Sequence, residues 1–345
     1  MERWMRRLSR LEIVLIFLVI IAGSVVRMTG SGMGCPDWPK CFGYMIPPTE
    51  RSTLEWQANR SFQKDNIIIV NEALYQAKKS FTSGTTYQPE NWEKYTRHDY
   101  AIFNAKHTWI EYINRLLGAL SGLPMLALVV LSIFYFKRDR RLLLLSGAGL
   151  FMLGFEAWLG KLVVDGNLIP GSITIHMIGA LMIVSLLLVL NGLLSQKNWK
   201  TLYYTPRFKN LLIVALVFTL VQIVLGTQVR EQVDSFTKMG LARSSWMENL
   251  NVTFYIHRSF SLAILALNVW LWHQNRKQQY GFWQLNAIML LLGVEILIGI
   301  ILAYFDLPAW TQPTHLLLGA LLFALQLQAL VQYSFAPKKR VIPVE

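Results

Sequence analysis

Apolar residues gather in long runs, separated by polar stretches, along the 345-residue chain. An α-helix needs about 20 apolar residues to cross the ~30 Å hydrocarbon core of a bilayer. Eight runs approach or exceed this length, at 11–29, 107–136, 142–164, 172–194, 209–229, 252–274, 282–304 and 312–333. The pattern therefore predicts an all-α integral membrane protein with eight transmembrane helices.

Charge and composition agree with this reading. The chain is 54% hydrophobic and 15% charged, whereas soluble domains carry about 25% charged residues. The net charge of +13 lies in short basic clusters beside the apolar runs. With eight crossings these clusters fall on one side, which the positive-inside rule makes the cytoplasm, together with both termini. We expect a multi-pass protein of a bacterial cell (inner) membrane, in contact with the lipid bilayer, and no nucleic-acid partner.

The largest stretch on the opposite side is the polar segment 30–106. It is long enough for short helices of its own. Ser52–Lys64 and Ile67–Ser80 have a mixed helical composition, and the sequence assigns them no role.

An internal repeat relates the two halves of the chain, 1–200 and 201–345. Four segments of the first half match four of the second, in the same order and at similar offsets. The pairs are Gly23–Arg27 with Gly226–Arg230, Tyr112–Arg115 with Tyr255–Arg258, Glu156–Gly160 with Glu295–Gly299, and the segments that begin at His176 and His315. Four helices in each repeat give both halves the same orientation, so we expect two parallel four-helix bundles.

Histidines near helix ends are the main candidates for chemistry. Each of His176, His257 and His315, taken singly, is compatible with an ordinary hydrogen-bonded helix-end histidine. However, His257 and His315 lie at similar depth in helices 6 and 8, where facing imidazoles could hold a haem iron. Four arginines at repeated positions suit haem propionates or simple snorkelling to the interface: Arg27, Arg115, Arg230 and Arg258.

Two other repeated or paired groups leave alternatives open. Cys35 and Cys41 follow helix 1 on the oxidising side, where a disulfide can persist, and it could be structural or redox-active. Glu156 and Glu295 lie mid-helix at matched positions. They could carry protons or form pairs inside the bundle, and the repetition favours pairing.

These residues together resemble the heme A synthase family over nearly the whole chain. The most specific pieces are the segment Thr29–Cys41, the helix Glu111–Gly118 and the histidines of helices 4, 6 and 8. The resemblance implies an oxidoreductase of two four-helix halves. It would convert heme O to heme A, for terminal oxidases, by oxidising a porphyrin methyl group to a formyl group.

The family pattern also assigns residue roles. It makes His257 and His315 the ligands of a haem b cofactor, and it places His176 beside the substrate haem. Glu111 matches an acidic residue implicated in the oxidation, and Cys35 with Cys41 match an outer cysteine pair.

One position departs from the family pattern. Where the family has histidine on helix 2, this chain has Asn114. His107 is the obvious substitute ligand, because it lies on the same helix face. It is seven residues away, however, which is ~10 Å along the axis, and it could instead meet a propionate or the outer loop. We therefore hypothesise that His176 alone holds the substrate haem, whose other face stays open beside Asn114 and Glu111. Glu111 would handle protons, and Asn114 would hydrogen-bond an oxygen species at the open face.

Two other functions fit the same residues. A di-haem b cytochrome could pass electrons from quinol without modifying haem, and a transporter or assembly factor could use the histidines structurally. The synthase reading implies heme O synthase as a partner and an electron donor such as quinol or another membrane reductant. The sequence leaves a homo-oligomer open.

Overall fold

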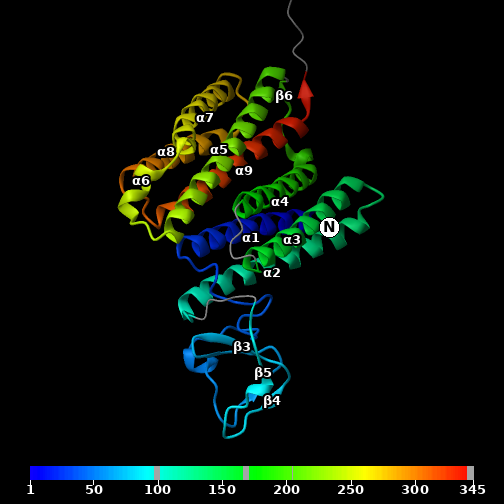
Figure 1. The fold of residues 1–345 in the computed structure, drawn as a ribbon. Helices are drawn as coiled ribbons and strands as arrows, with labels where there is room; N and C mark the ends of the chain where they lie inside the picture. Colours follow the sequence, from blue (N-terminus) through cyan, green and yellow to red (C-terminus); the bar gives the residue numbers. More distant parts are fainter. Residues whose placement is uncertain (97–101, 166–170, 204, 340–345) are drawn as a thin grey trace, which may run out of the picture. The chain divides into compact units, whose positions relative to one another are not determined.

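Eight long apolar helices dominate the structure, a computed structural model that describes residues 1–96, 102–165, 171–203 and 205–339 (Figure 1). They are α1 (Glu2–Met28), α2 (Ala105–Phe134), α3 (Arg140–Asp165), α4 (Ser172–Ser195), α5 (Pro206–Lys238), α7 (Val252–Lys277), α8 (Trp283–Tyr304) and α9 (Thr311–Phe335). Each is long and apolar enough to cross a membrane. The eight predicted spans are confirmed, and the protein is a multi-pass membrane protein.

Local sequence signals mark where several helices begin. Asn251 precedes α7, and its side-chain oxygen accepts the Thr253 N–H at 2.9 Å. At the start of α2, the Asn104 side chain accepts two backbone N–H groups of the first turn, at 3.0 and 3.3 Å. α5 begins with Pro206, whose fixed φ suits the first helical position. The two asparagines satisfy N–H groups that a first helical turn leaves without partners.

The four C-terminal long helices pack against one another. α5 lies against α7 and α9, and α8 lies against α9 and α7 (Figure 1). Phe208, Tyr280, Phe282 and Tyr333 fill part of their interior, with ring centroids 4.6–6.2 Å apart. A short helix, α6 (Trp246–Asn249), precedes α7, and strands β6 (Leu202–Tyr203) and β7 (Lys338–Lys339) pair in parallel. The arrangement as two four-helix bundles stays a prediction.

Packing divides the chain into two compact units, and each is described by itself. The first contains Met1–Ile21, Leu120–Glu156 and the chain from Ile173 onward, and the second contains Ala22–Ala119 and Ala157–Ser172. In the first unit, apolar side chains of α1, α4 and α9 share one core. The predicted halves 1–200 and 201–345 rest on sequence repetition rather than on packing, and they stay a prediction.

The expectation of helices in 52–64 and 67–80 is wrong, because most of the regular structure there is β. β2 (Ile67–Val70), β3 (Ala73–Ala77) and β5 (Trp92–Lys94) form an antiparallel sheet in that order, and β1 (Ser61–Phe62) pairs with β4 (Phe81–Thr82). Successive isoleucines in β2 favour a strand. Asn71 and Glu72, with φ of 50° and 56°, join β2 and β3 through a two-residue turn. Short 3₁₀ turns occupy Arg51–Leu54 and Pro89–Asn91.

Candidate functional site

Two carboxylate–histidine pairs occur at matched positions of the repeat, both within the first unit. His176 Nδ1 of α4 lies 2.5 Å from Glu156 Oε2 of α3. His315 Nδ1 of α9 lies 3.1 Å from Glu295 Oε1 of α8, outside hydrogen-bond geometry. The two glutamates thus pair inside the helices, as the repetition suggested. A carboxylate at Nδ1 orients the ring and leaves Nε2 available, the usual arrangement of a metal-binding histidine.

The imidazoles of His257 on α7 and His315 on α9 lie beside each other. Their ring centroids are 6.2 Å apart, and the ring planes make an angle of 79°. With a metal–nitrogen bond of about 2 Å, two ligands on opposite sides of one metal would have centroids roughly 6.3 Å apart. The buried Nδ1 of His257 has no hydrogen-bond partner among the described residues. The separation of the two rings therefore fits two histidines that would hold one metal ion.

A glycine on a neighbouring helix makes room for His257. A methyl group on Gly226 of α5 would lie 3.1 Å from His257 Cε1, which is tighter than nine in ten real Cβ contacts. At the matched place of the second unit, a methyl group on Gly23 would lie 3.7 Å from Asn114 Oδ1. Asn114 therefore lies opposite its glycine as His257 does, which supports the repeat. The buried Oδ1 of Asn114 has no hydrogen-bond partner in the described part of the chain.

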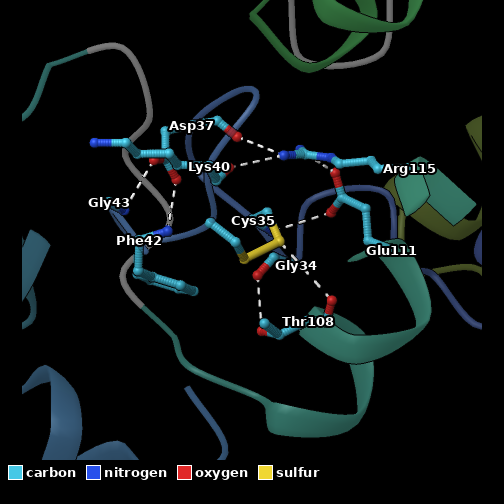
Figure 2. Close-up of a disulfide and its surroundings, with 10 residues drawn as sticks. Gly34, Cys35, Asp37, Lys40, Phe42, Gly43, Thr108, Glu111 and Arg115 are labelled. Atoms are coloured by element: carbon cyan, nitrogen blue, oxygen red, sulfur yellow. Dashed lines mark hydrogen bonds and ion pairs between the residues drawn. A yellow bond between two sulfur atoms is a disulfide. The ribbon is translucent and has the colours of Figure 1, made fainter. Parts of the chain in front are cut away.

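The cysteine loop 34–43 is held against α2, within the second unit (Figure 2). Cys35 and Cys41 form the expected disulfide, with an S–S distance of 2.03 Å. The Cys35 N–H donates to Glu111 Oε2 at 2.9 Å, and Arg115 Nη2 donates to Glu111 Oε1 at 2.5 Å. Thr108 Oγ1 donates to the Gly34 carbonyl at 2.8 Å. The carboxylate of Glu111 is thereby fixed by a loop N–H on one oxygen and a guanidinium on the other.

Asp37 organises the inside of this loop, a role that the sequence reasoning missed. Its carboxylate accepts the N–H groups of Phe42 at 2.6 Å and Gly43 at 2.8 Å. Burial raises the pKa of the Asp37 carboxyl, while these two N–H groups and the Arg115 charge oppose the rise. Its position between the two cysteines, within the segment that carried the family resemblance, was the available signal.

The other arginines lie in differing surroundings. Arg230 pairs with Asp234 at 2.8 Å and also donates to the Gln312 side chain. Arg258 is exposed, with its guanidinium carbon 5.4 Å from the ring centroid of Tyr255. Arg27 lies half-buried in the last turn of α1. Their proposed contacts with propionates stay predictions.

His107 lies in the first turn of α2 and is half-buried. Its backbone packs tightly on the cysteine loop, since a methyl group on Gly34 would lie 2.6 Å from the His107 carbonyl carbon. Whether its ring binds iron stays a prediction.

The fold and these contacts define a multi-pass membrane protein with repeated carboxylate–histidine pairs inside its helices. The family model described as COX15-CtaA, cytochrome oxidase assembly protein, matches residues 6–81 and 76–327. The chain belongs to this family.

Several curated relatives carry the name heme A synthase. The protein of Shewanella oneidensis is 26% identical over 269 residues, which is 75% of this chain and 69% of that protein. The protein of Flavobacterium psychrophilum is 20% identical over 351 residues, covering 93% and 95% of the two chains. That of Wolbachia sp. subsp. Brugia malayi is 22% identical over 340 residues, covering 90% and 91%. The resemblance to the heme A synthase family is confirmed.

Proposed function

We propose that this protein is a heme A synthase, an oxidoreductase that converts the methyl group of heme O to the formyl group of heme A. Heme O is the substrate and heme A the product, for use by terminal oxidases. The observation that carries the proposal is the repeated carboxylate–histidine pair in a chain of this family. One such pair serves the substrate haem and the other a resident haem b.

His257 and His315 are the residues that would hold the iron of haem b. Their centroid separation of 6.2 Å suits two ligands on one iron, and the Glu295 carboxylate beside His315 Nδ1 leaves Nε2 available. Haem bound there supplies a one-electron carrier. Arg230 and Arg258 are the arginines of this half that we propose for its propionates.

His176, Arg27, Asn114 and His107 are the residues proposed for the substrate haem. His176 is the proposed iron ligand in the first unit, because Glu156 holds its Nδ1 at 2.5 Å and leaves Nε2 free. In the second unit, Arg27 is proposed for a propionate. The role of Asn114 is to donate its amide N–H to an oxygen of the reacting group. His107 remains a second candidate ligand.

Glu111 is the proposed proton acceptor. Oxidising a methyl group to a formyl group releases protons as well as electrons, so a carboxylate held in one orientation suits the task. The Cys35 N–H and the Arg115 guanidinium stabilise the ionised form of Glu111, which is the form that accepts a proton. Arg115 Nη1 donates to two loop carbonyls, those of Asp37 and Lys40, so fewer of its N–H groups are available to a propionate than the sequence suggested.

We place the protein in a bacterial cell membrane with both termini in the cytoplasm, on the strength of its basic clusters. Heme O synthase is the proposed source of substrate, and a quinol or another membrane reductant is the proposed electron donor. Assembly of this protein as a homo-oligomer stays a prediction.

Co-expression with a heme O source tests the function. Haem extracted from the purified protein should contain heme A, or hydroxylated heme O on the way to it, when analysed by mass spectrometry. Glu111→Ala should abolish heme A. Extraction of haem b alone from the wild-type protein would instead favour an electron-transfer cytochrome.

A further inference from the structure

Arg115 joins α2 to the cysteine loop through a single guanidinium. Nη1 donates to the carbonyl oxygens of Asp37 at 2.6 Å and Lys40 at 3.0 Å, while Nη2 donates to Glu111 (Figure 2). The side chains of Arg115 and Glu111 are 13% and 5% exposed. A planar fork of donors can reach three acceptors at once, whereas a lysine ammonium cannot reproduce that geometry. Charge-assisted bonds shielded from water are also among the stronger hydrogen bonds.

The loop that Arg115 grips is itself closed at two places. The disulfide joins Cys35 to Cys41, with their Cα atoms 4.9 Å apart. Asp37 then bonds the backbone N–H groups of Phe42 and Gly43, which follow the second cysteine. Gly43 has a φ of 78°, and a side chain there would collide with the backbone of Asp65 and Asn66. The loop therefore reaches α2 in one defined conformation.

These two sets of contacts meet at the carboxylate of Glu111. One of its oxygens accepts the Cys35 N–H, and the other accepts the guanidinium that holds the carbonyls of the same loop. We propose that Arg115 and Asp37 are positioning residues, which lock the Glu111 carboxylate and the disulfide loop into one unit and thereby set the direction in which Glu111 takes up its proton. This inference rests on the proposed function, in which Glu111 accepts that proton.

Two consequences follow for variants. Arg115→Lys or Asp37→Asn should loosen the loop as well as Glu111, so the Cys35–Cys41 disulfide should become easier to reduce. The turnover number for heme O should fall while its KM changes little, because the donors of Arg115 are directed at loop carbonyls and Glu111, and the Asp37 carboxylate accepts N–H groups of the loop. Both effects should be on the order of tenfold, the size expected for losing a hydrogen bond to a charged group.

The first measurement needs no haem chemistry. The full-length purified protein is treated with dithiothreitol, and thiol alkylation is followed by mass spectrometry. We expect Arg115→Lys and Asp37→Asn to speed reduction about tenfold, and Thr108→Val, which loses one neutral bond to the loop, to speed it only a few fold. Arg51→Lys is the matched control, since Arg51 pairs with Glu72 in an exposed ion pair at 3.3 Å, in the same segment. It should reduce at the wild-type rate.

The second measurement is heme A formation by the same variants, with haem b absorbance as the check on folding. A lower turnover number, an unchanged KM and a normal haem b spectrum support the positioning role. Wild-type reduction rates in both Arg115→Lys and Asp37→Asn overturn it, as does faster reduction with wild-type turnover. A wild-type protein that makes no heme A refutes the proposed function, and with it the proposed effect of Arg115 and Asp37 on proton uptake by Glu111. Faster disulfide reduction in the variants would in that case still support the link between Arg115 and the loop.

Discussion

Replacing Glu295 tests whether the carboxylate beside His315 supports haem binding. Glu295 Oε1 lies 3.1 Å from His315 Nδ1, and the two side chains are 18% and 27% exposed. Glu295→Gln keeps the size of the side chain and an oxygen that can accept the ring N–H, but it removes the negative charge. Glu295→Leu removes the charge and the acceptor together.

The expected magnitudes follow from the strength of the lost contact. The Glu295 carboxylate lies 3.1 Å from the ring nitrogen outside hydrogen-bond geometry, and a charge contact of this kind contributes up to about 1 kcal/mol. Glu295→Gln should therefore cost at most about 1 kcal/mol, or roughly fivefold in haem b affinity. Loss of the whole contact in Glu295→Leu should cost about 10–100-fold. The carboxylate favours the ferric form more than the ferrous form, so its loss should raise the midpoint potential. A fivefold difference between the two forms corresponds to about 40 mV.

The assay is a redox titration of the purified protein, followed by the haem absorbance, together with haem content after purification. Glu12→Gln is the control, because Glu12 is a fully buried carboxyl on α1 whose oxygens accept no hydrogen bond from a histidine in the described part of the chain. An unchanged midpoint potential and unchanged haem content in Glu295→Leu would refute the reasoning. An equal shift in Glu12→Gln would show that any buried carboxyl has this effect.

Three further predictions test the histidine surroundings. Gly226→Ala should weaken haem b binding by about tenfold, because its methyl group would lie 3.1 Å from His257. Gly299→Ala is the control and should retain haem b, because its methyl group would make an ordinary contact with His315 at 3.8 Å. The haem absorbance of both purified variants is the measurement. Gly179→Ala would drive a methyl group into the carboxylate of Glu156, which holds His176. The yield of heme A should therefore fall about tenfold while haem b is retained. An undiminished yield of heme A would contradict the role of the Glu156–His176 pair. Asn114→His should lower heme O turnover by filling the proposed open face, and turnover at the wild-type rate would remove the reason for proposing it.

The transmembrane helices could be predicted because membrane crossing depends on length and hydropathy, which a single sequence displays. The sheet in segment 30–106 could not be predicted in the same way. Its central hairpin turns at Asn71 and Glu72, both with positive φ. Glutamate is not a usual turn signal at such a position, so this part of the sequence read as mixed helix. Pairing with distant strands decided its structure.

The repeat predicted much of the site but not its contacts. It placed Glu156 and Glu295 at equivalent positions, and the structure adds that each lies at the Nδ1 of a histidine. Arg115 is different, because its matched position suggested a propionate. Its donors instead bond loop carbonyls that lie 75 and 78 residues away in the sequence. Only the folded path of the cysteine loop could reveal that, since carbonyl oxygens leave no mark in a sequence.

The glycine opposite Asn114 has an evolutionary consequence. Gly23 lies opposite Asn114 of α2, as Gly226 lies opposite His257 of α7. The codons of asparagine and histidine differ only in their first base. A single point mutation would therefore place a histidine at position 114, matching His257 in the repeat and opposite a glycine that is already present. Random mutagenesis under selection for heme A supply can thus ask directly whether a cell prefers the symmetric or the asymmetric protein.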